Sequence, residues 1–258
     1  IDGVQSVAVS AGGPDLALAI AYGNTGIVVA GAAWSTALGG NFDFALARLA
    51  GDGALDTGFG TGGTVQINWD MGGNHNDVAW AIGVWPDGEI VAASDVASGA
   101  DSWMWMLHRY SASGTYLDGI FGTYCGGLAP PCSPAPQDSP RAMLLQGDGK
   151  LLVAGFGLGA AGDSDFGLMR RNRDLSPDNL FGGGDGQLTL DFALGGGAHR
   201  DHAMAMAFDR DGRIVVAGSA EWSGLDTDFA WARFDSSYIF ADGFDWPGGS
   251  SRWSATVP

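Results

Sequence analysis

The sequence predicts an all-β chain: a β-propeller built from four repeats of about 62 residues with four antiparallel strands each. Three observations lead to this prediction. One motif recurs four times in a constant register, Asp-Gly pairs stand at equivalent places in the repeats, and the composition favours turns over helices. The chain has 44 Gly, yet its only glutamates are Glu89 and Glu221 and its only lysine is Lys150. Helices favour Glu, Lys and Ala, whereas Asp and Gly favour tight turns.

The repeat is defined by three anchors. An apolar run that ends in two small residues occupies 27–31, 90–94, 151–155 and 214–218, so its last residue recurs at spacings of 63, 61 and 63. An arginine recurs in the same register at Arg48, Arg109, Arg170 and Arg233. An aspartate does so at Asp15, Asp77, Asp138 and Asp201. Three anchors in one register divide the chain into copies of about 1–60, 61–122, 123–182 and 183–244.

The second copy shows the internal pattern of a repeat. Short apolar runs rich in β-branched and aromatic residues, each expected to be a strand, cover 65–69, 78–85, 89–96 and 103–110. The link between the second and third strands carries Asp-Gly at 87–88, 148–149 and 211–212, which supplies the positive φ angles of a tight hairpin. In the second strand both alternating sets of side chains are apolar, as in 79–84 and 203–208, so we expect this strand to be covered on both faces.

A four-stranded antiparallel unit that repeats radially is the plan of a propeller blade. We therefore expect one domain over residues 1–244, followed by a C-terminal tail over 245–258. A linear β-solenoid stack is the alternative that the same repeat permits. The copies are in phase with the two ends of the sequence, and no strand is left over to close a ring by exchange. Closure would then come from blade packing alone, from the tail or from another molecule.

The segment from Asp43 to Val65, DFALARLAGDGALDTGFGTGGTV, together with the Asp-Gly hairpin and the IVVAG run, resembles the delta-60 repeat, a bacterial repeat of secreted and surface proteins. The resemblance covers nearly the whole chain, but copy three departs from it after Phe181 and copy two loses the GGTV segment to a cysteine loop. It implies an extracellular, propeller-like protein and no catalytic residues. The ending IFADGF at 239–244, followed by Trp253-Ser254, resembles a tail of exported proteins of some proteobacteria.

Charge and hydropathy exclude several classes of function. The formal net charge is −17, and the sequence lacks the clustered Lys and Arg that bind phosphates, so no nucleic-acid partner is expected. No stretch approaches the roughly 20 apolar residues that span a bilayer, and we expect a soluble globular chain. Numbering from Ile1 without a Met fits a processed, exported bacterial protein. We therefore place the chain outside the cell or on the cell surface.

The copies serve as a control, because a residue that recurs in every copy is required by the blade and one that occurs once is freer to serve function. The recurring Asp and Arg residues are accordingly interpreted as structural. The fourth copy offers His-x-Asp-His at 199–202, so His199, Asp201 and His202 are weak candidates for a metal site. Asp- and Gly-rich loops could also offer oxygens to Ca²⁺, but no segment matches an established calcium loop, so no cofactor is expected.

No signature of an enzyme is present: the chain has no Gly-x-Ser-x-Gly elbow, no His-Glu-x-x-His and no phosphate-binding loop. We expect no catalytic residues. Cys125 and Cys132 bracket a turn sequence, Gly-Gly-Leu-Ala-Pro-Pro, and favour a local disulfide in an oxidising compartment. Because this loop replaces a strand of the other copies, it is also a candidate contact surface.

The remaining copy-specific features are tryptophans in loops and in the tail, at Trp34, Trp222, Trp246 and Trp253. Such residues suit protein interfaces or stacking on sugars. The sequence thus predicts a secreted, non-enzymatic scaffold that acts through protein contacts, by self-association or with another extracellular protein. A carbohydrate-binding module is the alternative, followed by a polysaccharide-active enzyme.

Overall fold

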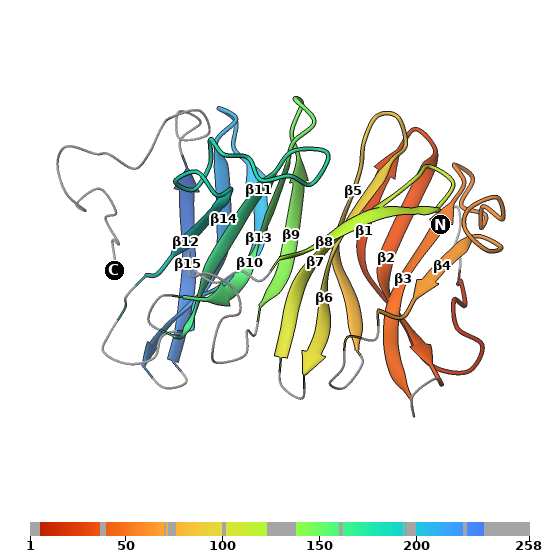
Figure 1. Cartoon of the computed structure of the whole chain (residues 1–258), viewed down its shortest axis with the longest axis horizontal. Coiled ribbons are helices and arrows are strands. Elements are labelled where there is room, and N and C mark those ends of the chain that lie inside the picture. Colours follow the sequence, from red (N-terminus) through yellow and green to blue (C-terminus); the bar gives the residue numbers. More distant parts are fainter. Residues whose placement is uncertain are drawn as a thin grey trace.

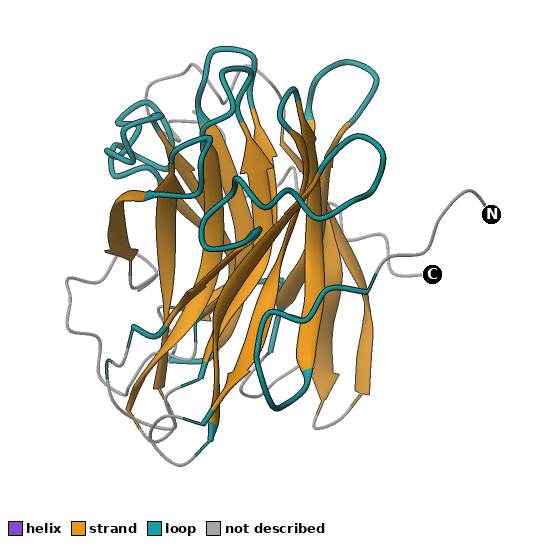
Figure 2. Ribbon diagram, turned by 90° about the vertical axis from the view of Figure 1, so that its right-hand side faces the viewer, coloured by secondary structure: helices purple, strands orange, loops and turns teal. Residues whose placement is uncertain are grey.

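The computed structural model describes residues 6–36, 40–69, 71, 76–99, 102–122, 138–159, 162–192, 194, 200–223 and 226–234. Over these residues it contains fifteen strands and no helix, and loops make every described connection (Figure 2). The strands form four antiparallel sheets, which we call sheets A to D in chain order. The predicted all-β class, with one sheet for each of the four repeats, is confirmed.

In each sheet the strands follow one another in chain order. Sheet A comprises β1 (Asp15–Gly23), β2 (Gly26–Ser35), β3 (Asn41–Leu49) and β4 (Thr64–Ile67). Sheet B comprises β5 (Asp77–Val84), β6 (Ile90–Gly99), β7 (Ser102–Tyr110) and β8 (Tyr116–Gly122). Sheet C comprises β9 (Ser139–Leu145), β10 (Leu151–Leu158), β11 (Ser164–Arg171) and β12 (Gln187–Leu190). Sheet D comprises β13 (His202–Phe208), β14 (Ile214–Ser223) and β15 (Asp226–Phe234).

The predicted Asp-Gly hairpins are present between the first two strands of sheets B, C and D. Gly88 has a φ of 91° and Gly149 a φ of 88°, in the left-handed region that a residue with a Cβ rarely adopts. Each of these glycines closes a turn by donating its amide to a backbone carbonyl three residues earlier, Trp85 and Gln146 respectively. The turn chemistry read from the sequence therefore fixes the start of each blade.

The strands group differently from the repeats. The first strand expected in the second copy, which the structure shortens to β4, pairs with β3 of sheet A in a register that sets Phe44 opposite Ile67. In the same way β12 pairs with β11 of sheet C, with Phe166 opposite Leu190. The connection after each of these outer strands crosses to the next sheet. The described part of sheet D therefore has three strands where four were expected, and Ser6–Val9 precedes sheet A outside any strand.

The sheets stack face to face through their first strands. Strand β5 lies against β1, β2 and β3, β9 lies against β5, β6 and β7, and β13 lies against β9, β10 and β11. Sheets A and D lie at opposite ends of the longest axis of the molecule (Figure 1). No extensive contact joins the described strands of these two sheets. The four blades thus form an open row rather than a closed ring.

An apolar core fills each of the three junctions. Between sheets A and B, for example, Phe44 and Leu46 of sheet A pack with Ile82 and Ile90 of sheet B. Both faces of β5 are covered, as predicted for the second strand of the repeat. The same prediction is wrong for β13, where half of the strand faces outward, because the described residues place no further sheet beyond sheet D.

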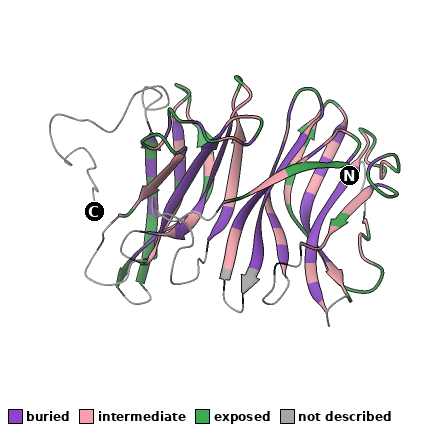
Figure 3. Cartoon of the chain, in the orientation of Figure 1, coloured by how far each residue is buried: buried purple, intermediate pink, exposed green. Residues whose placement is uncertain are grey.

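The two end sheets expose positions that are buried inside the row. Phe229 and Trp231 of β15 stand at the repeat positions of Phe166 and Leu168, which are completely buried. Phe229 is fully exposed and Trp231 is 65 % exposed. At the other end Ile20 of β1 is 69 % exposed, whereas Ile82 at the same position of β5 is 8 % exposed. Figure 3 shows exposed segments on the outermost strands and mostly buried residues in the middle sheets.

Two substitutions at one repeat position show how much a covered face contributes to the free energy of unfolding. We expect Phe166→Ala to lower the free energy of unfolding by about 3 to 5 kcal/mol, since it leaves a cavity between sheets C and D. Phe229→Ala should change it by less than about 0.5 kcal/mol in dilute monomeric protein, because this ring contacts solvent. Urea unfolding followed by tryptophan fluorescence gives both values. Equal losses from the two substitutions would contradict the open row.

Candidate functional site

Two of the recurring aspartates anchor a sheet to the end of the preceding one. Asp77 is buried and accepts a hydrogen bond from the amide of Trp69, just after β4, at 2.9 Å. Asp201 accepts one from Phe192, just after β12, at 2.8 Å, and another from Glu221 of β14 at 3.3 Å. Each carboxylate therefore links the exit of one blade to the entry of the next, as the structural interpretation of the sequence requires.

The other two recurring aspartates also accept backbone amides, Asp15 from the segment before sheet A and Asp138 from within sheet C. The Asp15 carboxylate accepts hydrogen bonds from the amides of Val9 at 2.8 Å and Ser10 at 3.2 Å. The buried Asp138 accepts one from Leu158 of β10 at 3.0 Å. Burial opposes the charge of Asp15, but its hydrogen bonds outweigh this effect and hold the pKa of this half-buried carboxyl below its usual value.

Two of the recurring arginines, Arg48 and Arg109, join neighbouring sheets at the opposite end of the strands. Arg48 donates Nε–H to Asp56 at 2.8 Å and also donates to the carbonyl of Ala112 in a turn of sheet B. Arg109 likewise donates to the carbonyl of Arg173 in the equivalent turn of sheet C, at 3.1 Å. These contacts support a structural role for the recurring arginines.

The last two recurring arginines differ sharply from each other. Arg170 is fully buried and pairs with Asp178 at 2.6 Å. Arg233 projects from the outer face of sheet D and is exposed. The burial of this repeat position therefore depends on whether another sheet covers it.

Of the three weak metal-ligand candidates, the structure describes Asp201 and His202. His199 lies outside the described residues, and His202 bonds Ser164 Oγ through Nε2 at 3.0 Å while its ring stacks on Phe156 with 3.9 Å between centroids. Burial is the main cause that lowers the pKa of His202. His202 is thus engaged with sheet C through Nε2 and its ring face.

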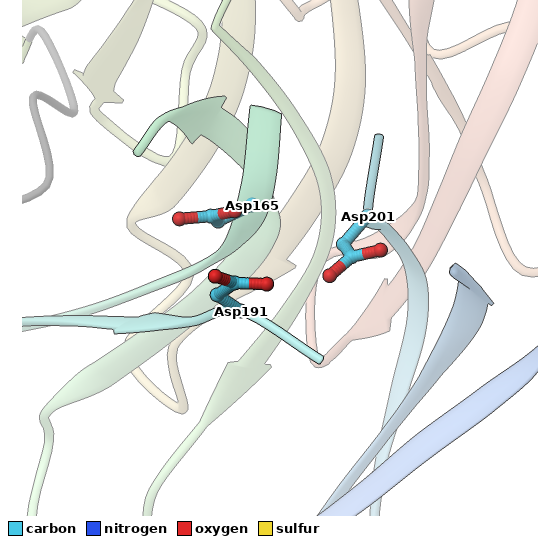
Figure 4. A group of neighbouring side chains, drawn as sticks. All are labelled: Asp165, Asp191 and Asp201. Atoms are coloured by element: carbon cyan, nitrogen blue, oxygen red, sulfur yellow. The ribbon is translucent and has the colours of Figure 1, made fainter. Parts of the chain in front are cut away.

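Asp201 instead belongs to a group of three carboxylates. One oxygen each from Asp165, Asp191 and Asp201 lies within 4.8 Å of the others, and the three side chains face a common space (Figure 4). Such a group could hold a divalent cation. Both oxygens of Asp201, however, already accept backbone amides. The sequence signal that could have identified this group is the Asp that opens each Asp-Phe motif, as Asp165 does.

One buried pair looks catalytic but is closed to solvent. Ser94 Oγ lies 2.5 Å from Nε2 of His108, the distance expected for a nucleophile and its base. Both residues are completely buried in sheet B. Burial lowers the pKa of His108 to about 3, so the ring stays neutral. The pair is accessible to no substrate in this arrangement and fills the core.

A second polar group, which the sequence interpretation did not single out, lies between sheets B and C. Trp80 Nε1 and Ser139 Oγ donate to Asp95 Oδ2 at 2.6 and 2.7 Å. The guanidinium of Arg141 lies 3.7 Å from the centroid of the Trp80 ring. Burial raises the pKa of Asp95, although both hydrogen bonds oppose this. One sequence signal could have identified this group: a single position of the repeat differs in every copy, where it is Leu18, Trp80, Arg141 or Met204.

The two contact tryptophans that the structure describes lie in strands of the two end sheets and not in the loops expected from the sequence. Trp34 is the penultimate residue of β2 of sheet A, where it contacts Phe42 edge to face at 5.3 Å between centroids and is half-buried. Trp222 is the penultimate residue of β14 of sheet D and is 43 % exposed. Trp246 and Trp253 lie outside the described residues, as do Cys125 and Cys132, so these contacts and the disulfide remain predictions.

The two end sheets each expose a face with apolar side chains. We define the D face by Ala217, Phe229, Trp231 and Arg233, which are all exposed. We define the A face by Ala17, Ile20 and Tyr22, which are exposed, with Val29, Ala47 and Leu49 beside them. A shallow pocket of about 210 Å³ opens on the A face and is lined by Ala17, Val29, Ala47 and Leu49, among others.

Comparison with known proteins agrees with this architecture. Residues 26–59 and 146–181 match a family described as "Domain of unknown function (DUF5122) beta-propeller". The fold is of the β-propeller type. The two matched segments cover equivalent parts of the first and third repeats, each with the apolar run and the recurring arginine. No curated protein gives a significant match. Among the described residues, no helix has the length and hydropathy needed to cross a membrane.

The buried Asp77 should make stability depend on pH. Burial raises its pKa to about 7, the carboxylates of Asp43 and Asp95 add to this, and the amide of Trp69 opposes it. Between about pH 4 and pH 7 the folded chain holds a proton that the unfolded chain releases, so this contribution to stability is complete below about pH 4 and is lost as pH rises through 7. It amounts to a few kcal/mol at most, at about 1.4 kcal/mol per pKa unit.

Asp77→Asn should flatten this part of the stability curve, because the amide stays neutral at every pH. Urea unfolding across the same pH range measures the slope, with the exposed Asp52→Asn as the matched control. A slope that Asp77→Asn leaves unchanged would contradict the assignment.

Proposed function

We propose that this chain is a secreted, non-enzymatic scaffold of the β-propeller type that acts through protein contacts and self-associates into an extracellular assembly. The observation that carries the proposal is the pair of uncovered end faces. A repeat protein that remains a monomer caps its terminal repeats with polar residues. Here both terminal sheets present large apolar side chains at positions that the interior repeats bury.

Size and composition of the end faces fit protein contacts. Exposed Phe and Trp beside a single Arg are the residue types that contribute most to interface energy. The formal charge of −17 opposes association elsewhere on the surface, since like charges repel. The extracellular location is supported by the resemblance of the repeats to secreted bacterial proteins and by the predicted Cys125–Cys132 disulfide.

The native chain should assemble as its concentration rises. We expect light scattering coupled to size-exclusion chromatography to give a mass that grows with loading, and negative-stain microscopy to show oligomers or filaments. Trp231→Asp should reduce association more than about tenfold, because it puts a charge at the centre of the D face. Leu117→Asp, at an exposed apolar position of β8 in a middle sheet, should leave association unchanged. A wild-type chain that stays monomeric at all concentrations would refute the proposal.

Carbohydrate binding is the second candidate, and the exposed ring of Trp222 is the observation that favours it. Trp34 is less suited, because its ring packs on Phe42 and against Gly13 and Gly40. Under this alternative the purified chain binds members of a glycan array, and Trp222→Ala abolishes the binding while Trp34→Ala retains it. Binding that survives Trp222→Ala would exclude this residue as the stacking platform.

A further inference from the structure

We propose that copies of this chain dock head to tail. The D face of one copy is covered by sheet A of the next copy, as sheet A is covered by sheet B within the chain. The inference rests on the proposed self-association and specifies its partner, polarity and register. Such an interface is heterologous, so it leads either to a closed ring or to a filament.

The D face carries the positions that every internal junction buries. The repeat position of Phe229 is held by Phe44, Trp105 and Phe166 in sheets A, B and C, and that of Trp231 by Leu46, Leu107 and Leu168. All six of these side chains are at most 1 % exposed. Only on sheet D does the pattern of large apolar residues face solvent. The D face is therefore one half of a junction that the chain forms three times.

The A face is the other half of the same junction. Ala79 and Ala203, which enter the preceding core from sheets B and D, are completely buried, and their counterpart Ala17 is exposed. Ile20 stands at the position of Ile82. The A face of a second copy thus has the same kind of surface as the faces that cover sheets A and C within the chain.

Side-chain sizes are complementary across the proposed contact. Within the chain the ring of Phe44 lies 4.8 Å from that of His108 and 5.7 Å from that of Tyr110. On sheet A the equivalents of these two residues are Ala47 and Leu49, which line the pocket of the A face. Phe229 of one copy would therefore enter the pocket of the next. The small Ala47 leaves room for Trp231, which is larger than the leucine of the internal junctions.

Arg233 has a matching acceptor on the second copy. Arg48 and Arg109 donate to the carbonyls of Ala112 and Arg173, each the second residue of a turn. The turn of Ala112 is closed by a bond from the amide of Gly114 to the carbonyl of Ser111, and that of sheet A by the bond from Gly53 to Ala50. The carbonyl equivalent to Ala112 is thus that of Gly51, which is exposed. Arg233 would donate to Gly51 of the next copy.

The segment Ser6–Val9 completes the register. The amide of Val9 bonds Asp15 as the amide of Trp69 bonds Asp77, so Ser6–Val9 corresponds to the end of β4. Strand β4 pairs with β3, and in the described residues no strand pairs with the outer edge of β15. In the docked arrangement Ser6–Val9 would lie along β15, with Val7 opposite Phe229 as Ile67 lies opposite Phe44.

Two single-face variants of the full chain test the polarity. Trp231→Asp disables the D face and leaves the A face intact, and Ile20→Asp does the reverse. Each variant alone should lose self-association more than about tenfold. An equimolar mixture should form a dimer with one copy of each variant and nothing larger, because only one intact pair of faces remains. Sedimentation velocity measures the masses, and the mixed dimer itself shows that both variants are folded. Leu117→Asp serves again as the control.

The outcomes separate this inference from the proposed function. If the wild type assembles but either variant alone still dimerises, self-association stands and head-to-tail docking is refuted, because an interface between two like faces is then in use. A mixture that stays monomeric also refutes it. A wild type that is monomeric refutes both proposals, and other residues of the chain or another partner would then cover the faces.

Cross-linking tests the register. In a C125S/C132S background, a short thiol-reactive bismaleimide should join Phe229→Cys and Ala47→Cys chains in a mixture into a covalent dimer, because the internal equivalents of these residues have neighbouring rings. Phe229→Cys mixed with Leu180→Cys, an exposed position on the turn after β11, should give no such product. Equal yields from both mixtures would overturn the register.

Discussion

Burial of an apolar sheet face beneath the first strand of the next repeat is the interaction on which this molecule depends. Each junction uses the same positions: two large residues from one sheet and alternating residues from the strand that covers it. Apolar burial contributes about 25 cal/mol per Å² without directional preference. It therefore supplies the attraction between blades but does not by itself determine how one blade sits on the next.

The polar residues of the repeat supply that missing direction. A buried aspartate accepts a backbone amide from the end of the preceding sheet at the junctions of sheets A with B and C with D. An arginine bonds a turn of the following sheet at the junctions of sheets A with B and B with C. Buried charged groups of this kind add little net stability, because their desolvation offsets most of the attraction. At the junction of sheets A and B, where both contacts are made, the two fixed points nevertheless exclude a sliding or rotated stack. The charges make the packing specific, and the apolar faces make it stable.

Most of the architecture could be predicted from the sequence, because turn chemistry and alternation are local. The hairpins at Gly88 and Gly149 and the four-blade plan follow from short-range preferences. The grouping of β4 with sheet A could not be predicted, since a strand of four residues pairs equally well in principle with either neighbour. The carboxylate group around Asp201 was missed because Asp165 and Asp191 reach it only through pairing across sheet C. The exposed end faces also depend on the absence of a neighbour, which no residue of the repeat encodes.

Because the three internal junctions are built from the same repeat positions, such chains can gain or lose blades during evolution. A duplicated repeat would find the surface it needs on both sides, because each blade presents the same large residues on one face and accepts them on the other. Blades could be gained or lost by recombination without the invention of a new interface. The terminal blades would then differ from the others only in whether a neighbour covers these positions, as at Trp231, whose equivalents in the other three sheets are buried leucines.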